Sequence, residues 1–270
     1  MKTLIQLNDF KREYKALKTE INAAIKRVLQ SGWYILGPEG EAFEKEMAAY
    51  LGVKYCVAVG NGTDAITLAL IAQGVGEGDE VITTNLTAFP TITGITRSGA
   101  QAVTADIDPH TGLINPAEIE KLITKKTKAI VPVHLYGQMC DIKPIMAIAR
   151  KYNLIVVEDC AQAIGARQGA KTAGTIGTAG CLSFYPTKNL GAFGDGGAVI
   201  TNSKQVYQKL LMLRNYGQRV RYYHDEQGIN SRLDELQAAI LRVKLKHLPN
   251  MIERRREIAR FYDTHLKNID

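Results

Sequence analysis

The chain has 270 residues, of which 46% are apolar, and a formal net charge of +7. This length suits one large domain or one domain with part of another, and the apolar fraction argues against global disorder. No stretch approaches the roughly 20 apolar residues of a membrane span, and no zinc-finger or RNA-binding motif accompanies the basic residues, so we expect neither membrane nor nucleic acid as a partner.

Two helices are predicted near the N-terminus. Apolar residues recur at spacings of three and four from Phe10 to Val28, which is typical of an amphipathic helix over 9–29. Asn8 or Asp9 can cap this helix, and Gly32 ends it. A second helix is predicted over 39–51.

Strands and helices then alternate. Strands are predicted at 55–59, 80–84, 101–107, 129–135 and 154–158, with helices at 65–73, 90–97, 116–123 and 142–152 between them. Strands at 181–185 and 198–202 follow, and then helices at 204–214, 234–248 and 252–266. The alternation predicts an α/β fold whose central sheet is mostly parallel and covered by helices on both faces. Ligands bind such sheets beyond the carboxyl ends of the strands.

The cysteines and the N-terminus bear on the compartment. The four cysteines have neither CxxC spacing nor a zinc-like histidine pattern, so we expect free thiols and no metal. The N-terminal stretch has too short an apolar run for a signal peptide, and a cytoplasmic protein is the expectation.

Polar and small residues follow three of the predicted strands. A Gly60–Asp64 turn opens a helix after the first, Glu158 and Asp159 close the strand at 154–158, and Lys188 precedes a glycine-rich stretch. A helix N-terminus can seat a phosphate, and carboxylates at the end of an apolar strand need a cationic or protonated partner. Each feature alone also fits an ordinary turn, cap or salt bridge. The glycines match neither a Rossmann nor a P-loop pattern.

Together the three strand ends offer an anion seat, a carboxylate and an amine. Pyridoxal 5'-phosphate requires this set: an amine for a Schiff base, an acid beside the pyridine nitrogen, and a phosphate site to which Ser183 can add its hydroxyl. Lys188 and Asp159 are therefore the candidate catalytic residues. The lysine can also act as a general base once an incoming amine releases it.

Seven blocks in chain order carry a resemblance to a known family; they lie at 31–53, 59–70, 78–91, 132–142, 156–166, 183–201 and 228–241. In these blocks the chain resembles the DegT/DnrJ/EryC1/StrS aminotransferases, sugar-modifying pyridoxal-phosphate enzymes of fold type I. The resemblance implies that Lys188 is the Schiff-base lysine, that Asp159 pairs with the pyridine nitrogen, and that Gln162 lies against the ring or its hydroxyl.

The same resemblance implies that Gly62, Thr63 and Ser183 hold the phosphate. It implies that Asn230 reaches the phosphate of a partner subunit, so that the protein is a homodimer. Glu158 is then expected to be structural.

Three further residues, Phe89, His134 and Tyr136, are candidates for contacts with cofactor or substrate. Many family members place an aromatic residue directly after the equivalent of Thr87, where it stacks on the cofactor. Here Ala88 stands there and Phe89 follows. Either Phe89 turns inward to stack or the stack is missing, and Phe89 is the candidate. His134 and Tyr136 lie at another strand end and could contact substrate, but a hydrogen-bonded structural histidine is the preferred interpretation.

The resemblance also implies a division into domains. Residues 1–248 would form a large cofactor-binding α/β domain that includes the helices at 9–51. Residues 249–270 would be the start of a small C-terminal domain that is largely absent, because family members continue for roughly another small domain.

The implied activity is transfer of an amino group from glutamate to a keto group, C3 above all, of a nucleotide-linked deoxysugar. A non-catalytic cofactor-binding regulator or an inactive fragment is the alternative, which the missing region favours and the Lys188–Asp159 pair disfavours. A sugar dehydratase is a third hypothesis, but related dehydratases carry a histidine in place of the lysine.

Overall fold

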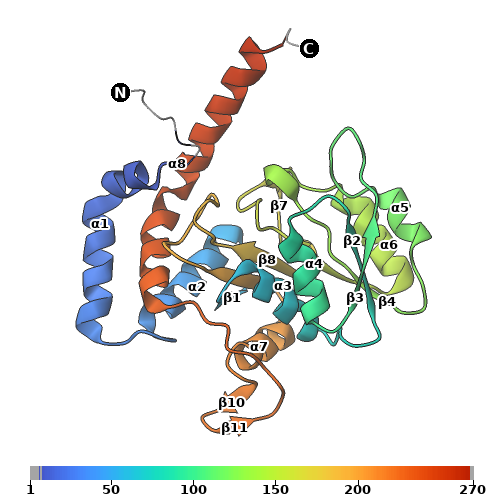
Figure 1. The fold of residues 1–270 in the computed structure, drawn as a ribbon, viewed down its shortest axis with the longest axis horizontal. Coiled ribbons are helices and arrows are strands. Elements are labelled where there is room, and N and C mark those ends of the chain that lie inside the picture. The colour runs from blue at the N-terminus through green and yellow to red at the C-terminus, as the bar shows by residue number, and fades with distance from the viewer. Residues whose placement is uncertain (1–5, 7, 268–270) are drawn as a thin grey trace.

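A seven-stranded sheet forms the centre of the computed structural model, which describes residue 6 and residues 8–267 (Figure 1). The outer ends of the two predicted domains, residues 1–5 and 268–270, lie outside the described part. The strands are β1 (Tyr55–Val59), β2 (Glu80–Thr84), β3 (Gln101–Ala105), β4 (Thr127–Ile130), β5 (Ile155–Asp159), β8 (Ala179–Ser183) and β9 (Gly197–Thr201). Two short hairpins, β6 (Arg167–Gln168) with β7 (Lys171–Thr172) and β10 (Gln218–Val220) with β11 (Tyr223–His224), stand apart from the sheet.

The order of strands across the sheet is β1-β9-β8-β5-β4-β2-β3. The pairs β8–β5, β5–β4, β4–β2 and β2–β3 are parallel, whereas β9 runs antiparallel to both of its neighbours. The predicted mostly parallel α/β fold is therefore confirmed. Because only β9 is reversed, the carboxyl ends of β1, β5 and β8 meet at the same edge of the sheet.

The helices are α1 (Phe10–Ser31), α2 (Pro38–Leu51), α3 (Gly62–Ile71), α4 (Phe89–Arg97), α5 (Pro116–Lys121), α6 (Ile142–Tyr152), α7 (Lys204–Leu213) and α8 (Glu235–His265), with a 3-10 turn at Leu135–Gly137. The predicted ends of α1 are confirmed: the Asp9 side chain accepts a hydrogen bond from the Arg12 amide, and Gly32 adopts the left-handed conformation. No helix in the described part of the chain is both long and apolar enough to cross a membrane.

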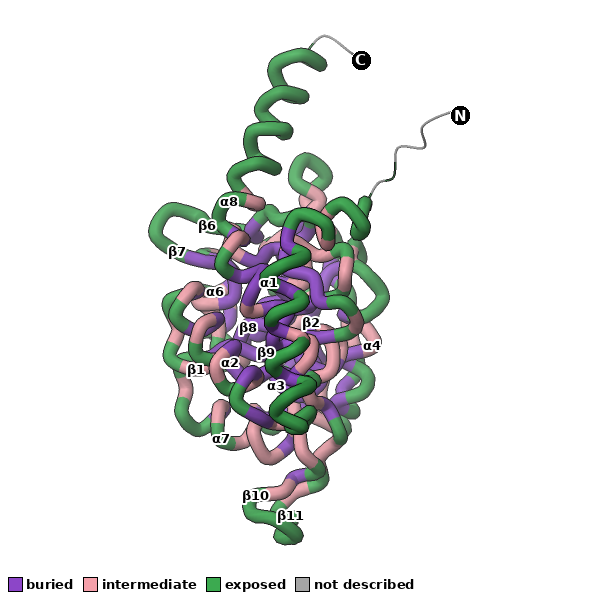
Figure 2. The backbone as a smooth tube through the Cα atoms, turned by 90° about the vertical axis from the view of Figure 1, so that its left-hand side faces the viewer, coloured by how far each residue is buried: buried purple, intermediate pink, exposed green. Residues whose placement is uncertain are grey.

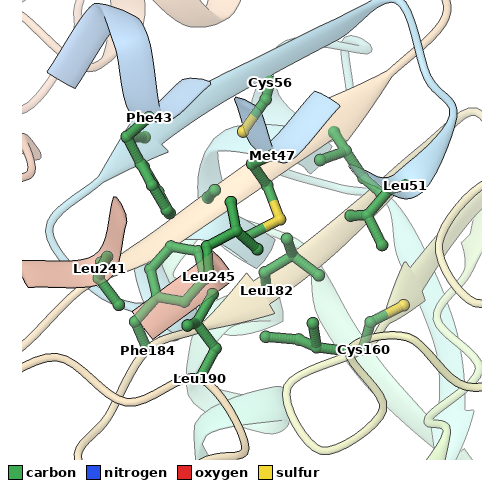
Figure 3. Packing of buried hydrophobic residues seen from close by; sticks show 14 of the residues in the cluster. Phe43, Met47, Leu51, Cys56, Cys160, Leu182, Phe184, Leu190, Leu241 and Leu245 are labelled. Carbon is green, nitrogen blue, oxygen red and sulfur yellow. The ribbon is translucent and has the colours of Figure 1, made fainter. Parts of the chain in front are cut away.

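Both faces of the sheet are covered, and the alternation of side chains along β1 shows how. Cys56 and Ala58 pack into a cluster with α2 and α8, part of which is drawn in Figure 3, whereas Val57 and Val59 pack against α3 and α7 on the other face. Successive side chains of a strand point to opposite faces, so a strand with apolar residues at every position requires cover on both sides. Figure 2 shows the buried centre between exposed outer helix faces.

The C-terminal helix differs from the prediction. The sequence predicts two helices at 234–248 and 252–266, but α8 is continuous through Pro249. Leu248 is buried in the cluster around α2, and Ile252, one turn later, packs against the same cluster, so tertiary contacts hold the helix on both sides of the proline. The predicted domain boundary at residues 248 and 249 falls within this helix, and the division into two domains stays a prediction.

The strands β4 and β8 also end earlier than predicted. The strand predicted at 129–135 ends at Ile130, because Pro132 offers no amide to the sheet and a 3-10 turn follows. The strand predicted at 181–185 ends at Ser183. Each difference leaves the following residues free to form the edge where the candidate site lies.

Candidate active site

A cavity of about 300 Å³ lies at the edge where β1, β5 and β8 end. Six of the predicted site residues line it: Gly62, Thr63, Asp159, Gln162, Ser183 and Lys188. The lining also includes Thr87, Thr91, Tyr185 and Asp195. Since these residues come from distant parts of the sequence, their convergence is a property of the fold.

The start of α3 forms one wall of the cavity. The Asn61 side chain accepts a hydrogen bond from the Asp64 amide at 2.8 Å, but the amides of Gly62 and Thr63 make no hydrogen bond with any described residue. A Cβ added to Gly62 would lie 2.8 Å from the Ser183 Cβ, so only glycine lets the helix approach β8 this closely. Two free amides at a helix N-terminus, beside a serine hydroxyl, suit an anion such as a phosphate.

The carboxylate of Asp159 lies at the end of β5 and is almost fully buried. Oδ1 accepts a hydrogen bond from the Ala161 amide at 3.0 Å, and Oδ2 accepts one from the Thr91 hydroxyl at 2.8 Å. Burial raises the pKa of Asp159, and these two donors offset part of that rise. A buried carboxylate with spare lone pairs is suited to a cationic partner.

Lys188 is partly buried, and its amine has no hydrogen-bond partner among the described residues. Burial lowers the pKa of Lys188, and the negative charge of Asp159 offsets part of that effect. A lowered pKa increases the fraction of neutral amine, which is the nucleophilic form.

The glycine-rich segment after Lys188 is fixed to α8 by two hydrogen bonds. Lys244 of α8 is buried, donates a hydrogen bond to the Gly191 carbonyl and pairs with Glu13 of α1 at 2.7 Å. The Phe193 amide donates to the Gln237 side chain, also of α8. The sequence does not predict this role of Lys244, because the residue looks like one of many lysines on a helix.

His134 and Glu158 lie outside the cavity and are structural, as predicted. The His134 ring is completely buried; its Nε2 lies 2.8 Å from Glu158 Oε2, and its Nδ1 accepts a hydrogen bond from the Cys140 amide. The Glu158 carboxylate also accepts three backbone amides, those of residues 174, 176 and 177. Hydrogen bonding with His134 helps to lower the pKa of Glu158 against the opposing effect of burial.

Three other candidates are not part of the cavity wall. Phe89 is 77% exposed, and its neighbours Ala88 and Pro90 line the cavity instead. Tyr136 is also exposed, although its amide donates to the Gln162 side chain at 2.9 Å. Asn230 is exposed and pairs with Asn215 away from the cavity. The aromatic stack by Phe89 and the phosphate contact by Asn230 both stay predictions.

Comparison with known proteins decides the family. The sequence profile of the DegT/DnrJ/EryC1/StrS aminotransferase family matches residues 15–270. The chain belongs to this family. The resemblance seen in the seven sequence blocks is thereby confirmed.

Individual relatives agree with this assignment. The chain is 50% identical to the dTDP-3-amino-3,6-dideoxy-alpha-D-galactopyranose transaminase of Aneurinibacillus thermoaerophilus, across 98% of this chain and 73% of the relative. It is 50% identical to a protein of Geobacillus stearothermophilus named a pleiotropic regulatory protein, across 96% and 69%. The crystal structure of S. venezuelae DesV matches with a TM-score of 0.95 and 44% identity, across 97% of this chain and 71% of DesV.

The cofactor of this family, pyridoxal 5'-phosphate, fits the residues of the cavity. The free amides of Gly62 and Thr63 match its phosphate, the buried Asp159 carboxylate matches a protonated ring nitrogen, and the unpaired amine of Lys188 matches its aldehyde. The protein is a pyridoxal-phosphate-dependent aminotransferase.

Proposed function

We propose that this aminotransferase moves an amino group from glutamate to the C3 keto group of a nucleotide-linked deoxysugar. The observation that carries the reaction type is the meeting of Lys188, Asp159 and the α3 N-terminus in one cavity. Support for the substrate comes from relatives at 44–50% identity, several of which are named for amination at position 3 of dTDP- or UDP-linked sugars. The names of these relatives differ in the nucleotide that carries the sugar and agree on C3 as the carbon that receives the amino group.

Each residue has a distinct part in this proposal. The bound cofactor supplies an aldehyde that takes up an amino group and a ring that stores an electron pair. The amides of Gly62 and Thr63 and the hydroxyl of Ser183 hold the phosphate. Asp159 keeps a proton on the ring nitrogen, because its buried carboxylate is stabilised by a positive neighbour. Lys188 holds the cofactor at rest and then moves the proton as general base.

The first experiment adds pyridoxal phosphate and then glutamate to the purified protein. We expect a visible absorbance band from the lysine-bound cofactor, and its conversion by glutamate to the amine form. A dTDP- or UDP-linked 3-keto sugar should then restore the band and gain an amino group detectable by mass spectrometry. The Lys188→Ala variant is the control. A band that forms but never responds to any amino donor would reject the transferase and favour the regulator hypothesis, which the name of one relative also raises.

The proposed assembly is a homodimer in which Asn230 reaches the partner's cofactor site. Asn230 precedes Ser231, whose hydroxyl accepts a hydrogen bond from the Gly60 amide. It also follows closely after the β10–β11 hairpin, which projects from the body of the molecule (Figure 1). Tyr222 and Tyr223 on this hairpin are exposed, as a surface that meets another subunit would be before assembly. Sedimentation velocity should show a dimer. We also place the protein in the reducing cytoplasm, because its four cysteines are buried free thiols.

A further inference from the structure

Behind the carboxylate of Asp159 lies a pair of threonine hydroxyls. Thr91 Oγ1 donates to Asp159 Oδ2 at 2.8 Å, and Thr87 Oγ1 lies 2.7 Å from Thr91 Oγ1. An ionised carboxylate can only accept, and a hydroxyl has one hydrogen to give, so Thr91 donates to Asp159 and Thr87 donates to Thr91. The negative charge of Asp159 thus sets the direction of both hydrogen bonds in the series from Thr87 through Thr91 to Asp159.

The first turn of α4 presents Thr91 in a fixed position. The helix begins after Ala88, which has no side-chain cap, and the Thr91 amide bonds back to the Ala88 carbonyl at 3.1 Å. Gly94 packs tightly on Ile66 of α3, and the Thr67 hydroxyl donates to the Gly94 carbonyl at 2.9 Å. Since α4 is held against α3 in this way, the Thr91 hydroxyl, which is itself buried, has little freedom to leave the carboxylate.

We propose that Thr91 is a positioning residue of the transamination site, whose hydroxyl holds the Asp159 carboxylate ionised and oriented so that the proton stays on the cofactor ring nitrogen. This inference rests on the proposed function of Asp159. Thr91 also lines the cavity, but in this role it acts through the carboxylate.

The surroundings of Asp159 explain why such a donor is needed. Burial raises the pKa of Asp159, which favours the neutral carboxyl and would draw the proton away from the ring. Lys188 faces the carboxylate with a positive charge only while its amine is protonated and free of the cofactor. His134 Nδ1 accepts an amide proton, so this ring carries no proton there, and Glu158 next to Asp159 on β5 is negative. Thr91 and the Ala161 amide are therefore the donors that persist throughout the reaction.

The test uses protein loaded with pyridoxal phosphate labelled with ¹⁵N in the ring. Thr91→Val keeps the branched shape and removes the hydroxyl, Thr91→Ser keeps the hydroxyl, and Thr96→Val is the matched control on the exposed face of the same helix. We expect the ring-nitrogen resonance of Thr91→Val to move toward that of a neutral pyridine. The half-reaction with glutamate should slow by about 10- to 100-fold, the range for a hydrogen bond to a charged group. Thr91→Ser and Thr96→Val should resemble the wild type in both.

Each outcome decides the matter. A Thr91→Val protein whose ring nitrogen resonates as in the wild type overturns the proposal, even if its thermal stability has fallen, since that result would describe a purely structural threonine. If Thr91→Val does not fold, Thr91→Ala answers the same question with the same readout. A wild-type ring nitrogen that is not protonated would overturn the role of Asp159 in the proposed function, and this inference with it.

Discussion

Replacing Gly62 by alanine tests how the cavity holds phosphate. The added Cβ would lie 2.8 Å from the Ser183 Cβ and 3.2 Å from its Oγ. Carbon atoms in contact are normally about 3.5–4.0 Å apart, so either the start of α3 or the end of β8 must move by about 1 Å. Overpacking of this kind costs about 1–3 kcal/mol. Because both sides of the clash are proposed phosphate ligands, the cost should appear as a cofactor affinity reduced by about 5- to 150-fold.

The assay is an absorbance titration of the apoprotein with pyridoxal phosphate and, separately, with pyridoxal, which lacks the phosphate. We expect Gly62→Ala to weaken the first much more than the second. Gly76→Ala is the matched control, because its added Cβ would meet only the Ser98 carbonyl oxygen, at an ordinary 3.5 Å. Wild-type affinity for pyridoxal phosphate in Gly62→Ala, or an equal loss for both ligands, would refute the assignment of the phosphate to the α3 N-terminus.

Three further predictions concern buried groups. Burial raises the pKa of Asp159, so ionising this carboxyl destabilises the folded apoprotein above that pKa. Asp159→Asn should therefore raise the melting temperature at pH 7, while transamination falls by several orders of magnitude. The rise in melting temperature should shrink as the pH falls and the wild-type carboxyl becomes neutral. A rise that is independent of pH would contradict this. Glu235 is buried, and its carboxylate accepts hydrogen bonds from the amides of Gly37, Glu39 and Gly40. Glu235→Ala should therefore lower the free energy of unfolding, measured in urea, by about 3 kcal/mol or more. The control Glu257→Ala, at an exposed position, should lower it by about 0.5 kcal/mol. Burial raises the pKa of all four cysteine thiols, those of Cys56, Cys140, Cys160 and Cys181. Ellman's reagent should therefore label none of them in the native protein and all of them after unfolding. Rapid labelling of the native protein would contradict this, because it would show that a thiol is accessible.

Much of the fold could be predicted because its strands are short apolar runs bounded by turn residues. The segment 55–59 is one such run, and its prediction is confirmed without change as β1. The reversal of β9 within a parallel sheet could not be predicted in the same way, since its residues are as apolar as those of its neighbours. The prediction that a helix ends near Pro249 is wrong, because the turns on both sides of the proline pack on one core and keep α8 continuous.

The residues that support the site were harder to predict than those that form it. Asp159 and Lys188 are visible from the sequence because Asp159 closes one buried strand and Lys188 follows another within a few residues. Thr91 is 68 residues from Asp159, and Lys244 is 53 residues from Gly191. Contacts at such separations leave no local pattern, because they depend on how α4 and α8 pack against the sheet.

The most direct test of this account asks which lysine holds the cofactor. The protein loaded with pyridoxal phosphate is reduced with borohydride, digested, and mapped by mass spectrometry. We expect one modified peptide, with the label on Lys188, and none in Lys188→Arg. A label on another lysine, or an unchanged labelled peptide in Lys188→Arg, would contradict the assignment of the cavity at the ends of β1, β5 and β8 as the active site.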